Sequence, residues 1–279
     1  MPRRARLDAE LVRRGLARSR EHASELVEAG RVSVRGMVAR KSATAVETDA
    51  PVVVAEDVDD PGWASRGAHK LLGALEAFEP EGVSVAGRRC LDAGASTGGF
   101  TDVLLRREAR EVVAVDVGYG QLVWKLQTDD RVHIHDRTNV RSLTPEDIGG
   151  QVDLVVADLS FISLKLVLPA LAACATPDAD LVPMVKPQFE VGKQRLGSGG
   201  VVRDPQLRAE AVLEVVQVAA ENGLGLRGVV ASPLPGPSGN VEYFLWLRPG
   251  ERTDAAAAEA LVADAVRRGP QTAVKNSHR

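Results

Sequence analysis

Cysteine is scarce in this sequence of 279 residues, which contains only Cys90 and Cys174. Both lie in apolar surroundings, and neither has further Cys or His residues at the spacing that a zinc site requires. Two thiols cannot build the disulfide framework of a small secreted protein. We therefore expect two buried, reduced cysteines and no metal site.

Long hydrophobic runs are missing as well. One of the longest, residues 166–175, is far shorter than the roughly 20 residues that span a bilayer, and it contains Pro169. Residues 1–8 have no apolar segment behind them and lack the pattern of a signal peptide. We expect a cytoplasmic protein without a membrane partner. Its 44% hydrophobic residues suffice for one sizeable core and a small extra domain.

The net charge of −3 hides an asymmetry along the chain. Residues 1–46 contain eleven Arg or Lys residues against five Asp or Glu, so the rest of the chain is acidic. A cationic module on an acidic body favours a polyanionic partner, because phosphate neutralisation supplies most non-specific affinity for nucleic acid. A solvated charged helix face would give the same composition. As a group, the candidate phosphate contacts are Arg4, Arg6, Arg18, Arg20, Arg31 and Lys41.

The first 58 residues have the pattern of a small α+β domain. Apolar residues recur at helical spacing in two stretches, which end at Gly15 and Gly30. Short strand patterns follow at residues 31–36, 44–46 and 52–54. Two short helices and a small sheet that carry clustered Arg and Lys residues are typical of a compact RNA-binding domain.

A glycine-rich turn, residues 92–99, follows an apolar run and precedes a second run that ends at Asp116. This is the pattern of the first βαβ unit of an open sheet that binds a nucleoside-containing cofactor. Glycine lets the backbone approach such a ligand, and Asp116 can accept hydrogen bonds from ribose hydroxyls. The spacing departs from the G-x-G-x-x-G of dinucleotide enzymes and is more like that of S-adenosylmethionine-dependent methyltransferases. A dinucleotide enzyme and a turn without ligand are the alternatives.

Seven apolar runs separated by helix-length segments dominate the chain beyond the linker. This alternation predicts a parallel sheet with helices on both faces, and seven runs fit a methyltransferase core. The expected strands are residues 89–92, 112–116, 132–135, 154–158, 181–186, 226–231 and 241–247. The expected segments are a domain at 1–58, a linker at 59–66, the main domain at 67–250, and residues 251–279 with an exposed helix at 253–268 and a tail.

Charged residues flank three of these strands. Asp158 and Lys186 follow their strands, and Glu242 lies near the start of the last. Ligands of such sheets bind beyond the carboxyl ends of the strands, and a ribose hydroxyl needs a basic group to take or shift its proton. Base methylation usually uses Asn-Pro-Pro or Asp-Pro-Pro after the fourth strand, whereas here Leu-Ser-Phe follows Asp158. A structural salt-bridge network is the alternative for these residues.

At these residues the chain resembles the TlyA-type ribosomal RNA 2′-O-methyltransferases of the FtsJ/RrmJ-like group, a family also known as haemolysins. The resemblance runs from about Arg6 to Trp246, and so many long matches in order are hard to produce by chance. The stretches that carry it are residues 65–71, 92–100, 116–120, 158–163, 185–190 and 236–242. The linker departs from some members of the family, which have a basic residue before Ala-Trp-Val, whereas this chain has Pro61-Gly62-Trp63-Ala64.

The resemblance implies an α/β fold, with a Rossmann-like seven-stranded core that uses S-adenosylmethionine and an S4-like RNA-binding domain in front of it. It implies 2′-O-methylation of cytidines in 16S and 23S ribosomal RNA, with no metal, and it does not imply an oligomer. The implied catalytic tetrad is Lys70, Asp158, Lys186 and Glu242, with Lys186 nearest the transferred methyl group. The implied cofactor contacts are Asp92, Gly94, Ser96, Gly98, Asp116 and Asn139.

Other functions are weaker alternatives. Pseudouridine synthases also carry S4 domains, but they need a catalytic aspartate in a β-rich domain, whereas Asp8 lies in the first small helix. A membrane-active toxin needs a spanning or strongly amphipathic segment, and none is evident. An RNA-binding assembly factor with an inert methyltransferase fold is disfavoured by the intact tetrad and glycine loop.

Overall fold

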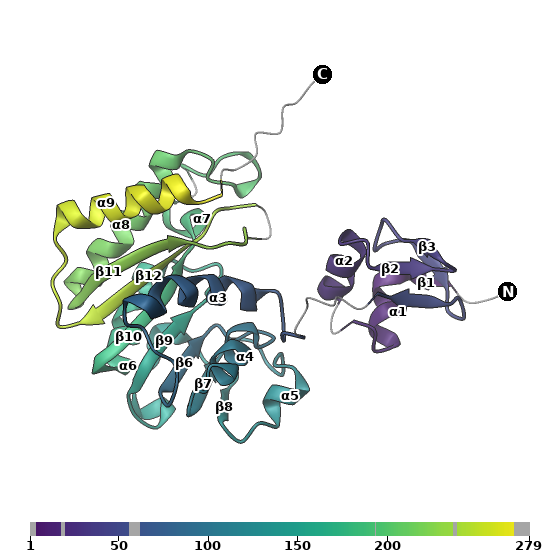
Figure 1. The fold of residues 1–279 in the computed structure, drawn as a ribbon, viewed down its shortest axis with the longest axis horizontal. Coiled ribbons are helices and arrows are strands. Elements are labelled where there is room, and N and C mark those ends of the chain that lie inside the picture. Colours follow the sequence, from purple (N-terminus) through teal and green to yellow (C-terminus); the bar gives the residue numbers. More distant parts are fainter. Residues whose placement is uncertain (1–3, 18–19, 56–61, 193, 237–238, 271–279) are drawn as a thin grey trace. The chain divides into compact units, whose positions relative to one another are not determined.

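The computed structural model describes residues 4–17, 20–55, 62–192, 194–236 and 239–270 (Figure 1). The chain forms two compact units, Met1–Ser65 and Arg66–Arg279. Within the described ranges, no helix combines the length and the apolar character needed to cross a membrane. Cys90 and Cys174 are both free and buried, as expected.

The first unit has two helices and short antiparallel strands. Helices α1 (Leu7–Arg13) and α2 (Arg20–Glu28) pack around buried Leu7, Leu11 and Leu26. Strand β1 (Arg4–Arg6) pairs with β4 (Ala45–Glu47), and β2 (Val32–Val34) pairs with β3 (Met37–Val38) and β5 (Val52–Val54). Both expected helices and all three expected strand regions are present. Strands β1 and β3 were not predicted, because two or three residues are too few to establish an alternation.

The second unit is built on a seven-stranded sheet with the order β11-β12-β10-β9-β6-β7-β8. Its strands are β6 (Arg89–Ala93), β7 (Glu111–Val115), β8 (Val132–His135), β9 (Val152–Ala157), β10 (Ala175–Val185), β11 (Leu224–Ala231) and β12 (Tyr243–Pro249). Each expected strand is confirmed to within a few residues, except that β10 begins earlier. The central strands are buried on both faces, which explains why they read as continuous apolar runs.

One strand runs against the expected direction. Strand β12 is antiparallel to both β10 and β11, whereas the pairs β10–β9, β9–β6, β6–β7 and β7–β8 are all parallel. The connection from β11 to β12 is too short to hold a crossover helix, so the chain returns in the opposite direction. This reversal places the start of β12 at the edge where β9 and β10 end.

Helices cover both faces of the sheet (Figure 1). Side chains of α6 (Leu168–Cys174), α8 (Pro205–Glu221) and α9 (Ala255–Arg268) share one core with the sheet. On the other face lie α3 (Gly67–Phe78) and α4 (Gly99–Arg106), whose aromatic rings Phe78 and Phe100 contact Trp246 and Phe244 of β12. The short helices are α5 (Trp124–Gln127), α7 (Pro187–Glu190), η1 (Glu79–Glu81), η2 (Val140–Ser142), η3 (Glu146–Ile148), η4 (Leu164–Leu166) and η5 (Ser198–Gly200).

Helix α9 corrects the expectation of an exposed helix at residues 253–268. Its inner face, which includes Ala258 and Val262, is buried against α8 and β11. The side chain of Asp254 caps the helix by accepting from the N–H of Ala257 at 2.8 Å. Small apolar residues at helical spacing create this buried stripe, so α9 belongs to the core of the second unit.

The sequence did not predict the first six residues of β10, because a charged residue, Asp180, interrupts the apolar pattern there. Asp180 is fully buried and accepts hydrogen bonds from Arg88, Arg248 and the Trp246 indole, each at 2.7 Å. These donors offset the cost of burying the charge. The register with β9 shifts between Ala175 and Asp180, an irregularity that an apolar pattern does not reveal.

Candidate functional site

Four charged side chains form two ion pairs where the parallel strands end. Lys70 Nζ, from α3, lies 2.5 Å from Glu242 Oε2. Lys186 Nζ, directly after β10, lies 2.6 Å from Asp158 Oδ1, directly after β9. Because β9 and β10 are parallel neighbours, their ends meet at one edge of the sheet.

The two ion pairs are neighbours as well. Val185 and Tyr243 are paired across β10 and β12, so Lys186 and Glu242 flank the same register position. The side chain of Gln188 donates to Glu242 Oε1 at 3.3 Å, two residues after Lys186. The structure therefore brings together all four residues of the expected tetrad.

Because these side chains are largely buried, each member of an ion pair depends on its partner. The side chains of Lys70 and Lys186 are each only 8% exposed, and that of Glu242 is fully buried. A buried ammonium is costly without a partner. Lys186 also donates to the hydroxyl of Ser160 at 2.8 Å, which fixes the direction of its amine.

Gly236 leaves room for the Glu242 carboxylate. A Cβ at residue 236 would lie 2.5 Å from Glu242 Oε1. A side chain at this position would force the Glu242 carboxylate or the backbone at residue 236 to shift. The next two residues of this motif, 237 and 238, lie outside the described residues.

The glycine loop after β6 closes against the same edge. Gly94 has φ +91° and Gly98 φ +99°, both in the region that favours glycine. A Cβ at Gly94 would lie 2.6 Å from the backbone oxygen of Asp158. The loop therefore contacts the segment that carries one member of the tetrad.

Asp116 holds this loop from the neighbouring strand. Its Oδ2 accepts from the N–H of Ser96 at 2.8 Å, and its Oδ1 accepts from the N–H of Gly118 at 2.7 Å. Ser96 itself has φ +47°, a conformation that this contact stabilises. Each carboxylate oxygen has a second lone pair, so Asp116 can still accept from a ribose hydroxyl.

Asp92 lies fully buried at the end of β6. One oxygen accepts from the Thr101 hydroxyl at 2.6 Å, and Oδ1 has no hydrogen-bond partner. Burial raises the pKa of Asp92 to about 7, and the nearby charge of Asp158 adds to the effect. Asn139, after β8, accepts from the N–H of Arg141 at 3.0 Å and so caps η2.

The expected phosphate contacts of the first unit differ in the partners that their side chains have. Arg6 and Arg20 both pair with buried Asp8, at 2.8 and 3.0 Å, and Arg6, with Arg20, holds the pKa of that carboxyl well below its usual range. The guanidinium of Arg31 donates to the backbone oxygen of Ala55. Two exposed candidates without an ion pair within the described residues are Arg4 and Lys41, and Arg18 lies outside them.

Residues that the sequence did not single out complete the site. The ring of Phe161 is 91% exposed, has φ +63°, and lies 5.4 Å from the Phe189 ring. A large residue in this backbone region is strained and worth noticing at a site. Both rings line a cavity of about 370 Å³, together with Gln188 and Leu196. The only sequence signal was their position within the matched stretches 158–163 and 185–190.

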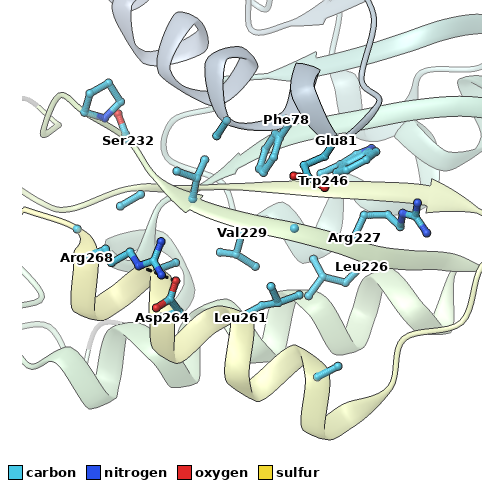
Figure 2. Close-up of a pocket in the computed structure, with 18 of the residues that line it drawn as sticks. Phe78, Glu81, Leu226, Arg227, Val229, Ser232, Trp246, Leu261, Asp264 and Arg268 are labelled. Carbon is cyan, nitrogen blue, oxygen red and sulfur yellow. Dashed lines mark ion pairs between the residues drawn. The ribbon is translucent and has the colours of Figure 1, made fainter.

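A larger cavity, of about 760 Å³, lies elsewhere in the second unit. It is enclosed by the end of α3, the edge strand β11 and α9, with Phe78, Trp246 and Leu261 among its walls (Figure 2). None of the four tetrad residues lines it. Across the described part of the chain, no group of three or more His, Cys, Asp or Glu residues is arranged to hold a metal ion.

Comparison with known proteins agrees with this geometry. An S4 domain model matches residues 5–52, and an FtsJ-like methyltransferase model matches residues 63–249. The chain is 65% identical to the 16S/23S rRNA (cytidine-2′-O)-methyltransferase TlyA of Mycobacterium tuberculosis, over 96% of this chain and 98% of the relative. It is 34% identical to Hemolysin A of Brachyspira hyodysenteriae, over 86% of this chain and 98% of that protein.

Similarity extends to a solved structure. A protein of Streptococcus thermophilus that bears the name of a hemolysin matches with a TM-score of 0.74 and 36% identity, over 96% of this chain and 97% of that one. The methyltransferase model covers more than half of the chain, and the relatives match along nearly their full length. The chain therefore belongs to the TlyA-type family of FtsJ-like methyltransferases that carry an S4 domain.

Proposed function

We propose that this methyltransferase transfers a methyl group from S-adenosylmethionine to the 2′-oxygen of cytidines in 16S and 23S ribosomal RNA. The observation that carries the proposal is that a buried ion pair, Lys70–Glu242, and a partly buried one, Lys186–Asp158, lie next to each other beside a glycine loop. The relative from Mycobacterium tuberculosis, with the same extent, bears the name of this activity. Such a substrate implies that the enzyme works in the cytoplasm.

The residues of the loop suit an adenosyl cofactor. Gly94 and Gly98 let the loop adopt positive φ and pack closely against Asp158 and Leu126, and Asp116 stands where ribose hydroxyls can donate to it. Asp92, whose Oδ1 is buried and has no hydrogen-bond partner, lies at the end of β6. Asn139 lies in the segment that follows β8. The residues proposed to hold the cofactor are Asp92, Gly94, Ser96, Gly98, Asp116 and Asn139. When bound, S-adenosylmethionine supplies an electrophilic methyl group on a sulfonium, which leaves as a neutral thioether.

Lys186 is the residue we place against the 2′-hydroxyl. In its neutral form, the Nζ amine would take the proton of the 2′-hydroxyl as that oxygen is methylated, and the resulting ammonium would be held by Asp158. Asp158 and Ser160 hold the amine in direction through their contacts at 2.6 and 2.8 Å. The Lys70–Glu242 pair supplies one further charge of each sign, so the four side chains are balanced when ionised.

The first unit is proposed to position the RNA. Its cations lie on a small domain of about 58 residues, and the main domain spans 67–250 with α9 packed on it. Phosphate contacts fix register without reading sequence, so we assign them to Arg4, Arg6, Arg18, Arg20, Arg31 and Lys41 as a group. The ion pairs of Arg6 and Arg20 with Asp8 hold two of these guanidiniums in place.

The test is transfer of label to ribosomal RNA. The purified protein is incubated with radiolabelled S-adenosylmethionine and unmodified small or large ribosomal subunits, and the labelled ribose is mapped by nuclease protection and mass spectrometry. Label on a cytidine 2′-oxygen in both RNAs is the expected result. Absence of transfer with cofactor demonstrably bound would instead favour a non-catalytic RNA-binding role.

A further inference from the structure

Glu190 joins the two segments that carry Lys186 and Asp158. It is the last residue of α7, and its side chain reaches back to the loop after β9. One carboxylate oxygen accepts from the hydroxyl of Ser163 at 2.6 Å, and the other accepts from the N–H of Leu164 at 2.7 Å. No residue of the expected tetrad takes part in these contacts.

Burying the charged carboxylate of Glu190 costs free energy of desolvation. The residue is only 7% exposed, and burial raises the pKa of its carboxyl above the usual range. Among the described residues, the cation that pairs with Glu190 is Lys165, whose Nζ lies 4.0 Å away and makes a closer pair with Glu214 at 2.7 Å. Since an apolar residue would avoid this desolvation cost, the hydrogen bonds of Glu190 point to a geometric role.

The two segments are connected at both ends. At one end lie the contacts of Lys186 with Asp158 and Ser160. At the other end lie the contacts of Glu190 with Ser163 and Leu164. Between them, the rings of Phe161 and Phe189 contact each other, and the cavity of about 370 Å³ opens on both segments.

We propose that Glu190 is a positioning residue for methyl transfer: it fixes the loop of residues 158–163 against α7 and so sets the approach of the substrate nucleoside to Lys186. This inference rests on the proposed function. The polar partners of Glu190 among the described residues are Ser163, Leu164 and Lys165, none of which belongs to the glycine loop, so its removal is expected to slow transfer without weakening cofactor binding. Misplacement of reacting groups by about 1 Å can cost 10²-fold in rate.

The experiment compares four variants in the full-length protein. Glu190→Ala removes both contacts, and Ser163→Ala removes one with little loss of volume. Glu190→Gln keeps both contacts, because an amide can accept from the N–H of Leu164 and donate to the Ser163 hydroxyl. Asp180→Asn is the matched control, a second buried carboxylate that lies in the middle of β10, away from Lys186. For each we measure the single-turnover rate on unmodified subunits, S-adenosylmethionine affinity by calorimetry, and thermal unfolding.

The expected result separates rate from stability. Glu190→Ala should lower the single-turnover rate by about 10- to 100-fold with an unchanged cofactor affinity, and Glu190→Gln should recover most of that rate. Asp180→Asn should lower the unfolding temperature but leave the rate per folded molecule unchanged. If Glu190→Ala does not fold, Ser163→Ala decides, with an expected loss of about 3- to 10-fold.

Two outcomes are distinct failures. If the wild-type protein binds cofactor but transfers nothing to either subunit, the proposed function fails. If the wild-type protein is active and Glu190→Ala, or Ser163→Ala in its place, is as fast per folded molecule, the positioning role is overturned. A rate that falls only in step with the folded fraction, as in Asp180→Asn, overturns it too.

Discussion

Gly94 lies so close to Asp158 that a Cβ at residue 94 would come within 2.6 Å of the Asp158 backbone oxygen. The first residue belongs to the loop proposed to hold the cofactor, and the second to the pair proposed to orient Lys186. Because that neighbour is backbone rather than a flexible side chain, it cannot move aside alone. The contact therefore couples the cofactor loop to the transfer site.

Gly94→Ala is expected to damage both functions of this contact. The substitution strains a backbone with φ +91° and forces the loop away from Asp158. We expect S-adenosylmethionine affinity and transfer rate each to fall by at least about 10-fold, a loss comparable to 1–3 kcal/mol of strain. The measurements are calorimetric titration with the cofactor and single-turnover transfer.

Gly87→Ala is the matched control for that experiment. Gly87 has φ +72°, but a Cβ there would meet nothing within 4 Å. It should lose about 1 kcal/mol of stability and keep its cofactor affinity. Equal affinity losses in the two variants would show that backbone strain, not the approach to Asp158, is responsible.

Lys186→Ala is expected to abolish transfer while cofactor binding persists. A positioned acid or base contributes about 10²- to 10⁴-fold in rate, and within the described residues no other amine forms an ion pair with Asp158. The single-turnover rate and the calorimetric affinity are measured on the same preparation. Lys125→Ala, which removes a half-exposed lysine paired with Asp102, controls for loss of a positive charge. Activity near the wild-type level in Lys186→Ala would remove this lysine from the proposed mechanism.

The strands of the sheet were predictable because the apolar run that marks each strand is a local feature of the sequence. Strands β6, β7 and β9 are buried on both faces, so their apolar residues run without interruption. The direction of β12 was not predictable in the same way, because its pairing with β10 joins residues far apart in sequence. Asp180 hid the first half of β10, since a charge inside a strand acquires partners only in the folded sheet.

The positions of several candidate site residues at strand ends were predictable from the sequence, but the contacts between side chains of different loops were not. Gly94, Asp116 and Lys186 stand at strand ends, where a sequence reader expects ligands. Glu190 and Gln188 gave no signal of their own, because their roles depend on contacts between two loops. The hydrogen bond of Asn139 to Arg141 likewise became visible only with the turn that it caps.

Substitutions in the Lys70–Glu242 pair should affect the free energy of unfolding and the transfer rate differently. Glu242→Gln leaves a buried ammonium without its counter-charge, which costs about 3–5 kcal/mol. Adding Lys70→Met removes that ammonium, so the double variant should regain most of the lost stability. Transfer should stay low in both variants, because neither has the intact charge pair. Denaturant unfolding and single-turnover rates measure the two effects, and recovery of both together would make the pair purely structural.

Asp92 predicts a pH dependence of stability. Its pKa is about 7 in the folded protein against 3.8 ordinarily, so between these values the folded state holds a proton that the unfolded chain has released. The stability that it contributes is therefore complete below about pH 4 and is lost as pH rises through about 7. The shift corresponds to about 4 kcal/mol.

Asp92→Asn isolates this effect, because its amide stays neutral at every pH and resembles the protonated acid in shape. The free energy of unfolding of both proteins is measured by denaturant titration from pH 4 to pH 8. We expect the wild-type value to fall relative to that of Asp92→Asn as pH rises, with most of the change between about pH 4 and 7. A difference that stays constant, or grows in the opposite direction, would show that Asp92 is ionised in the folded protein throughout this range. The charge would then need a donor for Oδ1, which has no hydrogen-bond partner in the structure.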